Sequence, residues 1–203
     1  MKEYITLIQN PREFFKSVVK ENITTTLKKA LPIIIVLFLV QTYIYYFISG
    51  KLNYFLGVSN SGIAFYFLTG IIVLPLTILV SAGLLILSLK ILKSKSSFSQ
   101  NLKLFLYAII PIYTVSILFY AIILALPNSM NQILLVFIFW LISFIWQVII
   151  IAIGISEFYK ISVGKSVGAY FLIFGLMFAA MLALIMVLLI IILIALLLIK
   201  GFK

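Results

Sequence analysis

The sequence predicts an all-α protein that five transmembrane helices embed in a membrane. Of its 203 residues, 66% are hydrophobic and only 9% are charged, a composition typical of membrane bundles rather than soluble domains. Five apolar stretches each reach the length of about 20 residues that a helix needs to cross a hydrocarbon core of roughly 30 Å. They lack the alternation of barrel strands, and backbone groups in lipid must be satisfied within the segment, so we expect helices.

The first 29 residues form a short N-terminal segment before the five-span domain at residues 30–203. Asn10 is a good N-cap for a helix that begins at Pro11, and Glu13 completes the pattern of a capping box. Apolar residues then recur on one flank of this helix and basic residues on the other: Phe14, Phe15, Val18 and Val19 against Arg12, Lys16 and Lys20. The segment is therefore expected to be an amphipathic interfacial helix. Its aromatic face would lie either in the headgroup region or against the underside of the bundle.

The five spans are expected at residues 30–49, 63–89, 104–126, 133–156 and 169–199. Pro75 and Pro111 interrupt the second and third spans and are expected to kink them, with the freed carbonyls satisfied by neighbouring groups. Gln41 and Gln147 lie well inside the first and fourth spans, where facing lipid would be costly. They are expected to form hydrogen bonds between helices, or else to line a polar cavity.

The fifth span is the longest. Its roughly thirty apolar residues would measure about 46 Å as one helix, so it must tilt, bend or emerge from the bilayer. Gly164 and Gly168 lead into it as a small-xxx-small pair, and Gly175 continues the small residues and is the expected place of a bend. Packing within the bundle is favoured for these glycines over a contact between two copies.

The basic residues predict how the chain is oriented. Twelve of the fifteen Lys and Arg residues precede the first span or lie in the connections after the second and fourth spans; the others are Lys51, Lys200 and Lys203. Positive charge favours the cytoplasmic side, so the N-terminus is expected in the cytoplasm and the C-terminus outside. The protein is then a multi-pass membrane protein, in the cell membrane if it is prokaryotic.

The net charge of +11 favours a membrane surface over nucleic acid, because the basic residues lie in short loops beside apolar helices and no soluble module presents them to a groove. Anionic headgroups of the cytoplasmic leaflet are therefore the expected partner, ahead of an acidic protein. The candidate interaction surface consists of Arg12, Phe14, Phe15, Lys16, Lys20, Lys93 and Lys95.

The chain lacks most of the side chains that enzymes use in catalysis, because it contains no histidine, cysteine or aspartate. The chain therefore has no histidine base for a serine hydrolase and no aspartates for an aspartyl protease. It also has no His or Cys ligands for a zinc, haem or iron–sulfur site. Gly164-Lys165-Ser166 resembles the end of a phosphate-binding loop, but Tyr159 stands where that motif requires glycine. Glu157 is expected to be a solvated carboxylate that pairs with Lys160 or Lys165. No enzyme activity, metal or cofactor is predicted.

Three segments carry a resemblance to a known family. They are the N-terminal Asn10-Pro11-Arg12-Glu13-Phe14-Phe15, the third-span Tyr107-Ala108-Ile109-Ile110-Pro111 and the turn Ser162-Val163-Gly164-Lys165-Ser166. Their order along the five spans resembles that of the YIP domain family, the five-span relatives of the Ypt/Rab-interacting proteins. The resemblance covers nearly the whole chain. It implies a non-enzymatic membrane protein whose eukaryotic relatives act in vesicle traffic, associate with one another and bind prenylated small GTPases.

This chain lacks the long acidic cytosolic tail of those relatives and its Asp-Leu-Tyr-Gly-Pro element, which speaks against GTPase binding and makes it more similar to prokaryotic members. The sequence therefore predicts a scaffold or membrane-organising factor that works through its basic cytoplasmic face and binds lipid, another membrane protein or a second copy of itself. The alternative is a small solute carrier or substrate-binding membrane subunit with a neutral polar cavity between Gln41, Gln147, Pro75 and Pro111.

Overall fold

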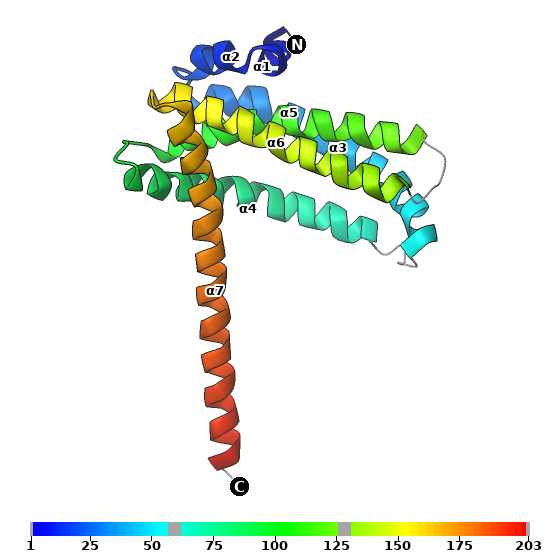
Figure 1. Ribbon diagram of the computed structural model, residues 1–203, viewed down its shortest axis with the longest axis vertical. Coiled ribbons are helices and arrows are strands. Elements are labelled where there is room, and N and C mark those ends of the chain that lie inside the picture. The colour runs from blue at the N-terminus through cyan, green and yellow to red at the C-terminus, as the bar shows by residue number, and fades with distance from the viewer. Residues whose placement is uncertain (1, 57–61, 126–130, 202–203) are drawn as a thin grey trace.

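A computed structural model describes residues 2–56, 62–125 and 131–201. The described chain is helical apart from its short connections (Figure 1), which confirms the all-α fold class. Its elements are α1 (Lys2–Gln9), α2 (Pro11–Val18), α3 (Ile23–Leu56), α4 (Gly62–Ile91), α5 (Phe98–Ala125), α6 (Asn131–Tyr159) and α7 (Val163–Gly201).

Helices α3 to α7 are each long and apolar enough to cross a bilayer, so the five predicted spans are confirmed. Several helices begin earlier than the apolar runs. Helix α3 starts at Ile23 and includes Lys28 and Lys29, and α7 starts at Val163. Hydropathy marks the part of a helix that lies in lipid, whereas the helix itself continues into the polar boundary.

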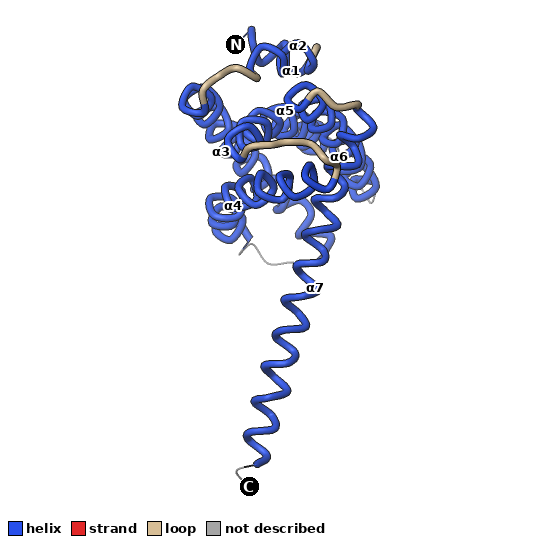
Figure 2. Tube along the Cα trace, turned by 90° about the vertical axis from the view of Figure 1, so that its left-hand side faces the viewer, coloured by secondary structure: helices blue, strands red, loops and turns tan. Residues whose placement is uncertain are grey.

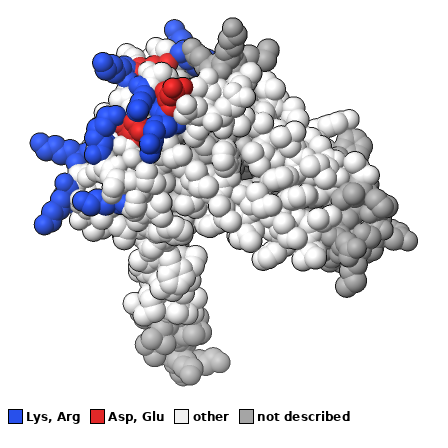
Figure 3. Space-filling view, turned by 45° about the horizontal axis from the view of Figure 1, so that its top comes forward, with Lys and Arg blue, Asp and Glu red and all other residues white. Residues whose placement is uncertain are grey.

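Helices α3, α4, α5 and α6 lie side by side with α5 at the centre, where it packs against the other three (Figure 1). Helices α1 and α2 lie against one end of this bundle, and α2 packs on α6. Figure 2, which views the molecule from the side of this end, shows the connections after α2, α4 and α6 together there. We call it the basic end, because Lys and Arg side chains gather on it (Figure 3). Lys28, Lys90, Lys93 and Lys95 lie in or beside these connections.

Helix α7 crosses the direction of the other spans and leaves the bundle (Figures 1 and 2). Only its first part packs against other helices: Ala169, Tyr170 and Ile173 are buried, whereas every residue from 177 to 192 is exposed. The helix is continuous through Gly175, the residue at which a bend was expected. At 39 residues it measures about 58 Å, nearly twice the hydrocarbon thickness.

Three prolines lie inside the spans, and each removes one backbone hydrogen bond. Pro111 is buried in α5, while Thr114 donates to the carbonyl of Ile110 at 2.9 Å. Pro75 lies on the side of α4 that faces α3. Pro32, which was not predicted to interrupt a span, lies in α3. It is close to the place where the hydroxyl of Tyr4 donates to the carbonyl of Lys29 at 3.1 Å.

Candidate functional site: the basic end of the bundle

The basic end is built on the docking of α2. The Asn10 side chain accepts from the backbone N–H of Glu13 at 3.4 Å, as its predicted N-cap role requires. The rings of Phe14 and Phe15 are 3% and 0% exposed. Phe14 packs edge-on against Tyr107 with 5.0 Å between ring centroids, so the aromatic face lies against the bundle. This finding decides between the two orientations left open, and it removes Phe14 and Phe15 from the exposed interaction surface predicted for them.

Gly154 explains how closely α2 approaches α6. A Cβ at this position would lie 3.1 Å from the Phe15 ring and 3.1 Å from the Leu104 side chain. A Cβ at this position would require Phe15 or Leu104 to move by a few tenths of an ångström. Phe15 also packs edge-on against Phe158 at 6.1 Å between ring centroids. The small residue in α6 therefore sets the depth at which the N-terminal segment docks.

Glu21 is the centre of a polar cluster between the N-terminal segment and the bundle. Its carboxylate accepts from Lys29 Nζ at 2.6 Å and from the hydroxyl of Tyr107 at 2.6 Å, with Thr26 at 3.4 Å. Burial raises the pKa of Glu21, but the hydrogen bonds from Lys29 and Tyr107 outweigh this effect and hold the pKa below its usual value. Glu21 is therefore a structural anion that joins the start of α3 to α5.

Lys103 is buried in the same region and fixes the turn between α2 and α3. The residue is buried, with 4% of its surface exposed. Its ammonium donates to the carbonyl of Val19 at 2.9 Å and to the carbonyl of Glu21 at 2.7 Å. The ammonium also lies 5.6 Å from the centre of the Phe158 ring. These carbonyls follow the end of α2, where a helix leaves acceptors without partners. Lys103 therefore caps α2 from a different helix.

Glu157 ties the other side of α2 to the end of α6. Its carboxylate pairs with Arg12 Nε at 3.3 Å and with Lys160 Nζ at 3.3 Å. The expected partner Lys160 is found, but Glu157 is 8% exposed and not the solvated carboxylate expected from the sequence. Docking of α2 covers it and supplies Arg12 as a second cation.

Asn101 joins three spans just inside this end. Its amide donates to the carbonyl of Ala82 at 2.7 Å, and its side-chain oxygen accepts from the hydroxyl of Tyr159. Asn101 is fully buried and thus links α4, α5 and α6. Sequence reasoning missed Glu21, Lys103 and Asn101. The available signal was three polar residues beside span ends, of which Lys103 was counted among the basic residues of a connection.

Five of the other basic side chains form an exposed set, which we call the basic rim: Arg12, Lys16, Lys20, Lys93 and Lys95. Lys16, Lys20, Lys93 and Lys95 are exposed, and the Arg12 side chain remains 55% exposed although it pairs with Glu157. Figure 3 shows Lys and Arg gathered at this end, while the rest of the described surface in that view is uncharged. Lys93 terminates α4 in the left-handed region, at φ 58°, with Ser94 N–H donating to the carbonyl of Leu89 at 2.8 Å.

The predicted polar cavity is assembled only in part. Gln147 donates to the hydroxyl of Tyr170 at 2.8 Å, which is the expected bond between helices. Both residues line a cavity of about 160 Å³ together with Thr77 and Ser81. Gln41 is buried in α3, away from this lining, and neither predicted proline belongs to it.

The glycines of α7 do not contact another described helix. A Cβ at Gly164, Gly168 or Gly175 would meet open space within 4 Å. The expected packing of these glycines inside the bundle is therefore not found. No three acidic, His or Cys side chains come together in the described parts of the chain to hold a metal.

The fold and the docked N-terminal segment agree with one family comparison. The family model of the Yip1 domain matches residues 5–199. The chain belongs to the Yip1 family. The match runs from α1 through most of α7, so it includes the N-terminal segment as well as the five spans. No curated protein and no solved structure matches the chain.

Proposed function

We propose that this Yip1-family membrane protein is a non-enzymatic scaffold that organises its surroundings through the basic rim. The observation that carries the proposal is the division of charge at the basic end. Glu157 and Lys103 are buried, Glu21 is partly buried, and the three hold the N-terminal segment in place, while the basic rim stays exposed. A fixed array of cations suits recognition of anionic headgroups and of an acidic membrane partner, with each Lys or Arg contributing about 1 kcal/mol at an anionic surface.

The proposal places the basic end in the cytoplasm and the C-terminus outside, in the cell membrane if the protein is prokaryotic. It is supported by the family membership and by the gathering of positive charge at one end of the helices. The exposed surface of the docked segment consists mainly of polar and basic side chains, because Phe14 and Phe15 face inward. Small GTPases are not part of the proposal.

The test is photo-crosslinking in native membranes from probes at the exposed positions Ser17 and Ser99, close to the basic rim, followed by mass spectrometry. Charge reversal of Lys16, Lys20, Lys93 and Lys95 to Glu is expected to abolish the specific adducts while the bundle stays folded. The matched control replaces the same four residues by Arg, which retains the charge and is expected to retain the adducts. Adducts that survive charge reversal unchanged contradict a charge-based scaffold.

A neutral solute carrier is the second candidate, supported by the cavity beside Gln147 and Tyr170. The amide of Gln147 is engaged by Tyr170 there, and the volume of about 160 Å³ suits only a very small solute. Uptake of a neutral solute into proteoliposomes that is lost on Gln147→Leu would support this candidate over the scaffold.

A further inference from the structure

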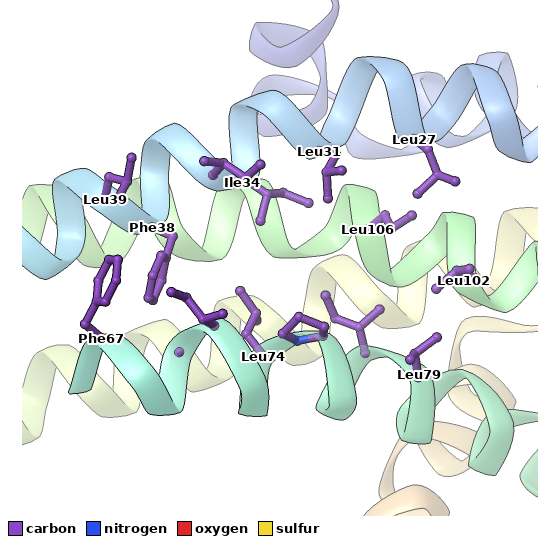
Figure 4. A pocket seen from close by; sticks show the side chains of 15 residues that line it. Leu27, Leu31, Ile34, Phe38, Leu39, Phe67, Leu74, Leu79, Leu102 and Leu106 are labelled. Carbon is purple, nitrogen blue, oxygen red and sulfur yellow. The ribbon is translucent and has the colours of Figure 1, made fainter. Parts of the chain in front are cut away.

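An apolar groove runs along the outside of the bundle between α3 and α4, with α5 as its floor (Figure 4). Its volume is about 540 Å³, and its fifteen lining residues are all Leu, Ile, Phe, Gly or Pro. Both α3 and α4 pack on α5, but they contact each other little, which leaves the space between them open to the side. No residue of the basic rim lines the groove, which shares the lining residues Leu74 and Ile78 with the cavity beside Gln147.

One end of the groove is closed by aromatic rings. Phe38 lies so close to Gly70 that a Cβ on the glycine would lie 2.1 Å from the ring, and Phe67 lies 6.1 Å from Phe38 between ring centroids. Figure 4 shows the two rings facing each other at this end, with Leu27 at the other end. Phe38 is eleven residues after Leu27, a distance of about 16 Å along a helix. The groove is therefore about as long as one bilayer leaflet is deep, roughly 15 Å.

These features select the kind of occupant. The lining offers no hydrogen-bonding side chain, so a sugar, a peptide strand or a polar solute would lose its partners on entering. A transmembrane helix is about 10 Å wide with its side chains, and one that lay along the groove would continue past Phe38 and Phe67. The two rings close that end, so they would block the helix. A single hydrocarbon chain that ends at Phe38 fits both the chemistry and the length. Because the groove opens sideways from membrane-spanning helices, bilayer lipids have direct access to it.

Two lysines stand on the groove side of the helices at the basic end. Lys28 precedes the lining residue Ile35 by seven positions, and Lys90 follows the lining residue Leu79 by eleven. Both spacings bring a residue back to within about 20° of the same helix face. Lys28 and Lys90 are exposed. Lys28 adjoins the lining residue Leu27 at the open end of the groove, whereas Lys90 lies about 16 Å beyond Leu79 along α4.

We propose that the α3–α4 groove binds one acyl chain of an anionic phospholipid from the leaflet at the basic end, with the headgroup beside Lys28. The chain fills the space from Leu27 to Phe38, and Lys28 selects an anionic lipid over a zwitterionic one. The proposal does not depend on the scaffold function, because the residues of the basic rim take no part in it.

The experiment uses the full chain in nanodiscs that contain phosphatidylglycerol with a photoreactive group near the end of one acyl chain. Mass spectrometry after illumination is expected to place adducts on α3 and α4 at the groove. Ile71 lines the groove and its neighbour Ile72 does not, although they are 50% and 64% exposed. We expect Ile71→Trp to lower groove labelling several-fold and Ile72→Trp to leave it at the wild-type level.

A second matched pair guards against misfolding of the first variant. Leu79 lines the groove at 46% exposed, whereas Val80 is 41% exposed and lies outside it. Leu79→Trp is expected to behave as Ile71→Trp does, and Val80→Trp as the wild type, with thermal unfolding recorded for each. Equal labelling in all four variants, or adducts spread over every span, shows general annular lipid and overturns the proposal.

The headgroup is tested with the same photoreactive chain on phosphatidylcholine. Lys28→Gln is expected to lower phosphatidylglycerol labelling by about fivefold, with little change for phosphatidylcholine. Lys90→Gln removes an exposed lysine farther from the groove and is the control, expected to leave both labels at the wild-type level. Equal labelling by the two lipids in the wild type overturns the anionic selection. Since the chain has no cysteine, Ile71→Cys and Met181→Cys proteins can be mixed and oxidised. A disulfide between them places α7 of a second copy in the groove and overturns the lipid as its occupant.

Discussion

The lysines of the basic end have two different roles that the sequence does not distinguish. Lys93 and Lys103 both lie beside the connection between α4 and α5, yet Lys93 is exposed and Lys103 is 4% exposed. The positive-inside rule counts charges near span ends and contains no information on their burial. What buries Lys103 is the turn at Val19 and Glu21, more than eighty residues earlier in the chain. Such a pairing depends on the fold and leaves no local pattern.

Replacement of Lys103 tests its structural role. Lys103→Met keeps the length of the side chain but leaves the carbonyls of Val19 and Glu21 without their donor. We expect a loss of about 1–3 kcal/mol in the free energy of unfolding, the usual cost of an unsatisfied buried polar group. Thermal unfolding in detergent measures it. Lys165→Met, which removes an exposed lysine from the same end, is the control and should unfold as the wild type does.

Glu21 predicts how stability depends on pH. Its pKa is lowered in the folded protein by the hydrogen bonds from Lys29 and Tyr107, which outweigh the opposing effect of burial. The folded state therefore holds this proton more weakly than the unfolded chain, whose Glu pKa is about 4.3. The stabilisation is fully present above that value and is lost as the pH falls through the lowered folded pKa.

The corresponding measurement compares the wild type with Glu21→Gln from pH 7 to pH 3. We expect the wild type to unfold at the higher temperature at neutral pH and the difference to shrink as the solution is acidified. A difference that stays constant over this range would mean that the charge of Glu21 adds nothing to folding.

At the scale of the helices, the sequence predicts what depends on local composition. Apolar length predicts all five spans, and Asn10 with Pro11 predicts the start of α2. The sequence does not predict whether α2 docks on the bundle or lies in lipid, because an amphipathic face matches either lipid or protein. The deciding feature is Gly154, which lets Phe15 approach α6. Glycine is common inside membrane spans, so its presence at this position does not by itself indicate a docked helix.

Docking of α2 can be tested as an element. Phe15→Ala removes a fully buried ring at the contact with Gly154 and Phe158, a change that costs about 3–5 kcal/mol in packed cores. We expect α2 to detach and trypsin to cleave at Lys16 and Lys20 several-fold faster in inside-out membrane vesicles, in which the basic end is accessible. Ile5→Ala, at a side chain that is 51% exposed in α1, is the matched control. Cleavage at the wild-type rate in Phe15→Ala would show that α2 stays docked without its central contact.

At the scale of the whole molecule, the arrangement of the spans is less predictable than their number. The bundle of α3 to α6 has polar bridges such as Asn101 that fix neighbours, whereas residues 177–192 of α7 are apolar on every side and exposed. A helix without a polar face carries no pattern that says which side packs. The direction of α7 therefore depends on the lipid and the neighbours around it, and these lie outside the information in one chain.

The same uniform apolar surface predicts where the C-terminus lies. A helix with no polar face is stable only in hydrocarbon or against protein, and α7 is long enough to cross the bilayer completely. With the basic end in the cytoplasm, five crossings put Lys203 outside. The chain has no cysteine, so Lys203→Cys and Lys95→Cys each introduce a single thiol for a membrane-impermeant maleimide. We expect Lys203→Cys to be labelled in intact cells and Lys95→Cys only after permeabilisation. If both variants require permeabilisation, α7 returns to the side of the basic end, and its apolar surface must be covered by the plane of the membrane or by another protein.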